Sequence, residues 1–78
     1  MKFSEKVRKL RRDMGWSQQE LAKRLGVSTR TIFTYESGRY PRYRETYDKL
    51  AQLLGVDVNY LRTEDEEFTT DVMELYGQ

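Results

Sequence analysis

Three times in this sequence a glycine, an apolar residue and a short polar residue follow one another directly. Glycine readily takes the left-handed conformation that ends a helix, and a Ser or Asp side chain accepts a hydrogen bond from a free backbone N–H at the start of the next helix. The apolar residue between them can pack against the first turns of that next helix. This pattern predicts short helices joined by tight turns. The three triplets are Gly15-Trp16-Ser17, Gly26-Val27-Ser28 and Gly55-Val56-Asp57.

The spacing of apolar residues supports five helices. The first is predicted over residues 3–14, where charged residues such as Lys6 fill the outward positions. Its inward positions are Phe3, Val7, Leu10 and Met14. The other helices are predicted over residues 18–25, 29–37 and 44–54, with a short fifth helix after Asp57. Helices this short with short connections favour an all-α, compact bundle.

The Thr, Ile, Phe and Tyr residues of segment 29–37 would equally suit a strand. The Ser28 cap and the glycine before it favour a helix. In a helix, Ile32, Tyr35 and Glu36 fall on one face, so we predict that this face is buried.

The composition excludes several kinds of function. A chain of 78 residues closes only one small core, and without Cys or His it has no disulfide, no thiol or imidazole catalyst and no zinc site with nitrogen or sulfur ligands. We therefore expect no enzymatic activity, no cofactor and no metal. The acidic run at residues 64–67 is interpreted as a helix start favoured by the helix dipole. Without a membrane-spanning apolar run or a signal peptide, a soluble, cytoplasmic protein is expected.

Charge divides the chain into two parts. Residues 1–62 carry all 14 basic residues and seven acidic ones, whereas residues 63–78 carry six acidic residues and no basic one. The formal net charge of +1 therefore conceals a basic domain of +7 followed by an acidic C-terminal segment of −6. A sign asymmetry of this kind often accompanies nucleic-acid binding.

Residues 18–37 meet the geometric demands of a helix-turn-helix, in which two short helices are joined by a tight turn. Ala22 is small where the two helices would cross closely, and Gly26 supplies the turn. The shared apolar seam consists of Leu21, Leu25, Val27, Ile32 and Tyr35. The exposed side of the second helix then carries hydroxyls, a guanidinium and an apolar ring, from Thr29, Arg30, Phe33 and Thr34.

In these residues the sequence resembles the Cro and phage-repressor type of helix-turn-helix regulators, often called the Xre family. The resemblance is carried by residues 15–28 (GWSQQELAKRLGVS), by Thr31-Ile32 and Tyr35-Glu36-Ser37-Gly38, and by residues 49–56 (KLAQLLGV). It covers residues 3–62 and implies a five-helix DNA-binding domain, residues 1–62, whose third helix lies in the major groove.

The resemblance also implies contacts with DNA. Base-edge contacts are implied for Ser28, Thr29, Arg30 and Thr34, with Phe33 against a thymine methyl. Arg30 is favoured for direct readout because a guanidinium can bond guanine bidentately, and the alternatives are a solvated side chain or a phosphate contact. Phosphate contacts are implied for Ser17 and Gln18, which otherwise only cap a helix. Phosphate contacts are also implied for the basic and aromatic loop formed by Arg39, Tyr40, Arg42, Tyr43 and Arg44. The alternative is that these are solvated surface residues without a role in binding.

Two further residues match a pair that forms a partly buried salt bridge in some members of this family. These residues are Arg11 in the first predicted helix and Glu36 in the third. The alternative is that both are unpaired surface charges.

The acidic segment, residues 63–78, has apolar residues at helical spacing and a capping-box spacing at its start. These features are compatible with a final amphipathic helix, although Thr69 and Thr70 weaken this interpretation. We favour a homodimer formed through Phe68, Val72, Leu75 and Tyr76. The alternatives are that its apolar residues pack on the domain itself, that the segment is a linker to a missing effector domain, or that it binds a partner protein.

Two functions remain open. The first is a sequence-specific regulator of transcription, a repressor that binds a palindromic operator in double-stranded DNA as a dimer. The alternative is an antitoxin-like protein-interaction module whose tail binds a partner protein. The basic loop and Arg30 favour the first, because a pure interaction module does not require clustered positive charge beside the recognition helix.

Overall fold

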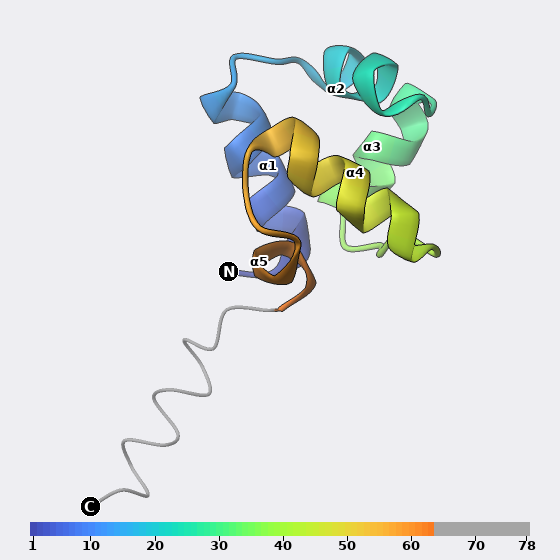
Figure 1. The fold of residues 1–78 in the computed structure, drawn as a ribbon. Helices are drawn as coiled ribbons and strands as arrows, with labels where there is room; N and C mark the ends of the chain where they lie inside the picture. Colours follow the sequence, from blue (N-terminus) through green and yellow to red (C-terminus); the bar gives the residue numbers. More distant parts are fainter. Residues whose placement is uncertain (64–78) are drawn as a thin grey trace, which may run out of the picture.

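The computed structural model describes residues 1–63 and folds them into five helices without strands (Figure 1). The helices are α1 (Phe3–Asp13), α2 (Gln18–Leu25), α3 (Thr29–Glu36), α4 (Arg44–Leu54) and α5 (Val58–Arg62). The predicted all-α class is therefore confirmed. The predicted bounds differ by one residue at the ends of α1 and α3, because Met14 and Ser37 are C-caps.

Each of the five helices contributes a fully buried apolar side chain to one core. These side chains, at most 1% exposed, are Val7, Leu21, Ile32, Leu50 and Leu61. The helical interpretation of α3 is confirmed, since Ile32 and Glu36 are buried and Tyr35 packs against the core. The core thus holds α2 and α3 against α1 and α4.

The helix starts predicted from the triplets are all present. The hydroxyls of Ser17 and Ser28 accept hydrogen bonds from the backbone N–H three residues later, at 3.0 and 3.2 Å. The Asp57 carboxylate accepts a bond of 2.7 Å from the N–H two residues later. The Glu20 carboxylate does not complete a capping box with Ser17, because it pairs with Arg24 at 2.7 Å.

The turn between α2 and α3 depends on Gly26, which has φ +85° and ψ +31°. The N–H groups of Gly26 and Val27 both donate to the carbonyl oxygen of Ala22, at 2.8 and 3.0 Å. This left-handed residue ends α2 and lets α3 begin three residues later.

Replacing Gly26 with Ala is expected to lower the free energy of unfolding by about 1 kcal/mol, because an L-residue is strained in the left-handed region. A Cβ at this position would lie 3.7 Å from the Lys49 ammonium, an ordinary contact, so the expected loss comes from the backbone alone. Urea denaturation measures it. The matched control is Gly55→Ala, which has φ +73° and no neighbour within 4 Å of the added Cβ. A loss at Gly26 well above that at Gly55 would contradict this explanation.

The side chains of α1 depart from the predicted pattern at two positions. Lys6, predicted to face outward, is 1% exposed, and its ammonium donates to the carbonyl oxygen of Tyr60 at 2.7 Å and to that of Thr63. The same ammonium lies 4.2 Å from the centre of the Tyr60 ring. The prediction was wrong because α5 packs on this side of α1 and supplies carbonyl acceptors for the charge. Met14, predicted to face inward, is 45% exposed because α1 ends before it.

The predicted sixth helix and dimer contact, at Phe68, Val72, Leu75 and Tyr76, lie outside the described residues. Among residues 1–63, no helix has the length and apolar character needed to cross a bilayer.

Candidate nucleic-acid interface

The outer face of α3 carries three of the side chains predicted to contact bases. Thr29, Arg30 and Phe33 are all exposed, and the Phe33 ring is 56% accessible. Within residues 1–63, Arg30 makes no ion pair. This face therefore presents an apolar ring beside a guanidinium whose donors are not used by neighbours in the described part of the chain.

The other two predicted base-contacting residues have hydroxyls engaged with α3 itself. Ser28 Oγ accepts from the Thr31 N–H and also shares a hydrogen bond of 3.0 Å with Thr31 Oγ1. Thr34 is half-buried, and its Oγ1 donates to the Thr31 carbonyl oxygen at 2.7 Å. Ser28 and Thr34 thus shape the start and side of α3, whereas Thr29, Arg30 and Phe33 form its exposed face.

The opposite side of α3 is attached to α1 by a buried ion pair. Arg11 Nε lies 2.6 Å from Glu36 Oε2, and Arg11 Nη2 lies 3.0 Å from Glu36 Oε1. The two side chains are 9% and 3% exposed. Arg11 Nη1 also donates to the Trp16 carbonyl oxygen at 2.7 Å, so one guanidinium connects α1, the turn before α2 and the end of α3.

Two further side chains reach Glu36, and sequence reasoning identified neither contact. Gln18 Nε2 donates to Glu36 Oε1 at 3.0 Å, and Arg8 Nη2 donates to the Glu36 carbonyl oxygen at the same distance. Arg8 Nε lies 3.8 Å from Glu36 Oε1. Gln18 is therefore a structural residue at the start of α2, in addition to its predicted phosphate contact. Its remaining amide proton is compatible with both roles.

The network determines the charge of Glu36. Burial raises the pKa of this carboxyl, but hydrogen bonds from Arg11 and Gln18, with the positive charges of Arg11 and Arg8, lower it by more. The net result is a pKa below the ordinary glutamate value, so Glu36 is ionised at neutral pH. A fixed negative charge thereby holds three donor side chains around the end of α3.

The loop between α3 and α4 brings the predicted basic and aromatic residues to the surface. Exposed side chains here are Arg39, Tyr40, Arg42, Tyr43 and Arg44. The loop is anchored by buried Pro41 and by the Tyr40 ring, whose centre lies 5.7 Å from that of the buried Phe3 ring. Among the described residues, none of the three arginines makes an ion pair. This loop joins α3 to α4 (Figure 1), and its exposed arginines therefore form a positive surface that follows α3.

The described part of the chain offers no metal centre. In residues 1–63 there is no group of three or more acidic side chains that could hold a metal ion. Every buried side-chain nitrogen or oxygen there has a hydrogen-bond partner.

A family model described as a helix-turn-helix domain matches residues 2–63. Among curated proteins, the cryptic phage CTXphi transcriptional repressor RstR of Vibrio cholerae is 38% identical over 64 residues, which cover 82% of this chain and 58% of that protein. The SPbeta prophage-derived uncharacterized HTH-type transcriptional regulator YonR of Bacillus subtilis is 36% identical over 59 residues, covering 76% and 55%. The chain thus spans little more than half the length of these two relatives.

Another relative has nearly the same length. An uncharacterized HTH-type transcriptional regulator of Archaeoglobus fulgidus is 35% identical over 74 residues, covering 94% of this chain and 96% of that protein. Among solved structures, the master regulator for biofilm formation SinR in complex with DNA has a similar fold, with a TM-score of 0.71 and 22% identity. That likeness covers 78% of this chain and 98% of the SinR chain and concerns the fold.

Proposed function

We propose that the protein is a sequence-specific regulator of transcription that binds double-stranded DNA. The proposal starts from the family: the chain belongs to the helix-turn-helix domain family, as its sequence motif predicts. We further propose that it is a repressor, as RstR is by name. Binding of this kind needs no bond-forming chemistry, so the proposal includes no catalytic role. We propose a cytoplasmic location.

The observation that carries the proposal is the two-sided character of α3. One side is fixed by the buried Arg11–Glu36 pair, and the other exposes Arg30 and Phe33. The major groove of B-DNA is about 12 Å wide and admits an α-helix. With α3 in that groove, the proposed base-contacting residues are Ser28, Thr29, Arg30, Phe33 and Thr34.

Phosphate contacts are proposed on both sides of α3. At the start of α2, Ser17 and Gln18 would present backbone N–H groups and the positive end of the helix dipole to one strand. Beyond α3, the exposed loop would lie along the backbone through Arg39, Tyr40, Arg42, Tyr43 and Arg44. Such contacts orient the protein, and the base contacts specify the sequence.

A single α3 reads only a short half-site, so we propose that two copies bind a palindromic operator with half-sites about 10 base pairs apart. The residues proposed to join the copies belong to the acidic segment, 63–78. Its net charge of −6 is repelled by the DNA phosphates, so we propose that the contact between the two copies lies away from the duplex.

Selection of bound sequences from a random duplex pool tests this function. The expected result is one enriched motif in two inverted copies about 10 base pairs apart. Binding without any enriched motif would contradict a specific regulator. An enriched motif in a single copy would support base readout and contradict the dimer.

Neutralising the loop is expected to weaken binding on all duplexes by a similar factor. In an Arg39→Gln, Arg42→Gln, Arg44→Gln variant, the slope of log K against log salt should fall by about 0.9 for each phosphate that the loop no longer neutralises. Binding titrations between low and moderate salt measure this slope. The matched control removes three exposed charges elsewhere, as Lys2→Gln, Lys9→Gln, Arg62→Gln. Equal changes in both variants would show an effect of net charge alone and would contradict binding of phosphates by the loop.

A further inference from the structure

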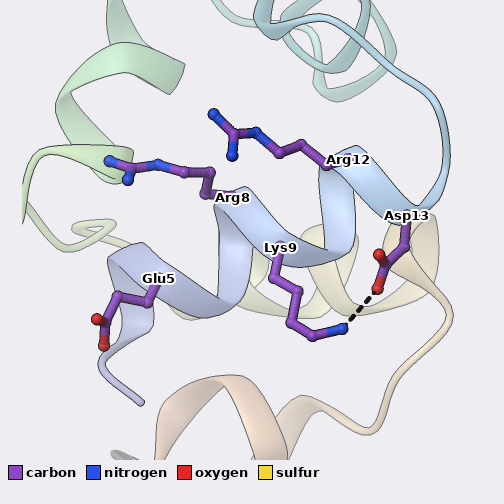
Figure 2. Close-up of a pocket in the computed structure, with 5 residues that line it drawn as sticks. All are labelled: Glu5, Arg8, Lys9, Arg12 and Asp13. Carbon is purple, nitrogen blue, oxygen red and sulfur yellow. Dashed lines mark hydrogen bonds and ion pairs between the residues drawn. The ribbon is translucent and has the colours of Figure 1, made fainter.

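The charged side chains on the outer surface of α1 project to two different sides of the helix. The exposed residues Glu5, Arg8, Lys9, Arg12 and Asp13 line an open hollow of about 260 Å³. Figure 2 shows Arg8 and Arg12 projecting to one side of the helix, while Lys9 projects to the other and meets Asp13. Lys9 Nζ lies 2.9 Å from Asp13 Oδ2, so this second side is internally paired. On the arginine side, Arg8 shares the Glu36 carboxylate with Arg11, and Arg12 makes no ion pair within residues 1–63, so this side keeps a net positive charge.

The arginine side is adjacent to the proposed DNA-binding elements. Arg8 donates to the Glu36 carbonyl oxygen at the end of α3, directly before the loop that carries Arg39. Arg11, next to Arg12 in the helix, donates to the carbonyl oxygen of Trp16, which precedes the Ser17 cap of α2. The Arg8 and Arg12 side of α1 therefore lies alongside both segments proposed to contact phosphates.

Both guanidiniums have donors to offer. Arg8 is half-exposed and uses one N–H on the Glu36 carbonyl, out of the five that a guanidinium carries. Within residues 1–63, the Arg12 side chain makes no ion pair, and its guanidinium points away from Asp13 (Figure 2). Arg11, by contrast, is buried and uses three of its five N–H groups on Glu36 and Trp16.

We infer that Arg8 and Arg12 are a third phosphate-contacting element, which connects the start of α2 and the loop after α3 into one continuous surface for the DNA backbone. Side chains four residues apart on a helix lie about 5–6 Å apart. One DNA strand carries a phosphate for about every 3.4 Å of its axis, so the two arginines can reach separate phosphates. This inference rests on the proposed DNA binding and adds α1 to the elements that contact DNA.

The test compares two single charge removals on the same helix, in the full chain and on the selected duplex. Arg12→Gln is expected to lower the salt slope of binding by about 0.9 and to leave the preferred sequence unchanged. Lys9→Gln, which removes the same charge from the other side of α1, is expected to leave the slope unchanged. Thermal unfolding of each variant confirms that the domain is folded.

The outcomes separate this inference from the proposed function. If the unsubstituted protein binds with a salt-dependent affinity and Arg12→Gln has the same slope, the inference is overturned while DNA binding stands. Equal reductions for Arg12→Gln and Lys9→Gln would also overturn it, because net charge would explain both. If the unsubstituted protein binds no duplex, the proposed function itself fails.

Discussion

Replacing Glu36 with Gln is expected to lower the free energy of unfolding by about 3–5 kcal/mol, the cost of removing one partner of a buried ion pair. Glu36 is 3% exposed and accepts from both Arg11 and Gln18, so the substitution leaves a buried guanidinium without its counter-charge. The measurement is urea denaturation at neutral pH. A loss typical of a surface substitution, within about 0.5 kcal/mol, would contradict burial of the pair.

A double-mutant cycle separates the pair from its surroundings. Arg11→Met alone should also be strongly destabilising, and the Arg11→Met, Glu36→Gln double variant should lose less than the sum of the two. The matched control is the exposed pair Lys9–Asp13, substituted as Lys9→Met and Asp13→Asn, for which little coupling is expected. Coupling near zero at Arg11–Glu36 would contradict the structure of the network.

The same carboxylate predicts how stability depends on pH. The pKa of Glu36 is lower in the folded protein than its ordinary value, so the unfolded state binds the proton more readily. The stabilisation is therefore complete above the ordinary glutamate range and is lost as the pH falls through it toward the folded pKa. Unfolding followed from pH 7 to acid should show a steeper loss for the unsubstituted protein than for Glu36→Gln. Parallel curves for the two would contradict this assignment.

Replacing Arg30 with Ala is expected to relax the base preference at one position of each half-site. A bidentate contact with guanine contributes about 1–3 kcal/mol of discrimination, which corresponds to a loss of about 5- to 150-fold between the preferred and the substituted base pair. Because Arg30 is exposed and makes no ion pair within residues 1–63, the stability of the domain should hardly change. Binding to a set of duplexes that vary each operator position measures the effect.

The three roles considered for Arg30 give different results in this experiment. Direct readout changes one operator position, whereas a phosphate contact weakens binding on every duplex and lowers the salt slope by about 0.9. A solvated side chain changes neither. Lys23→Ala, an exposed charge removal on α2, is the control for general electrostatics.

The helices could be predicted because their start and stop signals are local. Ser17, Ser28 and Asp57 cap backbone N–H groups within three residues of themselves, and Gly26 ends α2 by its own conformation. These interactions depend on short stretches of sequence and not on which helices pack together, so the sequence is sufficient to place them.

The interactions missed from the sequence depend on packing between distant segments. Lys6 is buried because α5, more than 50 residues away, supplies carbonyl acceptors for it. The spacing of Lys6 did indicate burial, since it lies three residues after Phe3 and four before Leu10, beside the apolar stripe of the helix. No sequence signal indicated the hydrogen bond from Gln18 to Glu36, because it depends on how α2 crosses the end of α3.

The contact between Lys6 and α5 has a consequence for synthesis of the chain on the ribosome. Lys6 is synthesised before the two residues whose carbonyl oxygens accept its hydrogen bonds, which lie 54 and 57 positions later. The two carbonyl oxygens that this ammonium contacts in the folded protein are both available only after residue 63 has left the exit tunnel. Closure of the core is therefore a late, long-range event, although every helix in the domain can start from local signals.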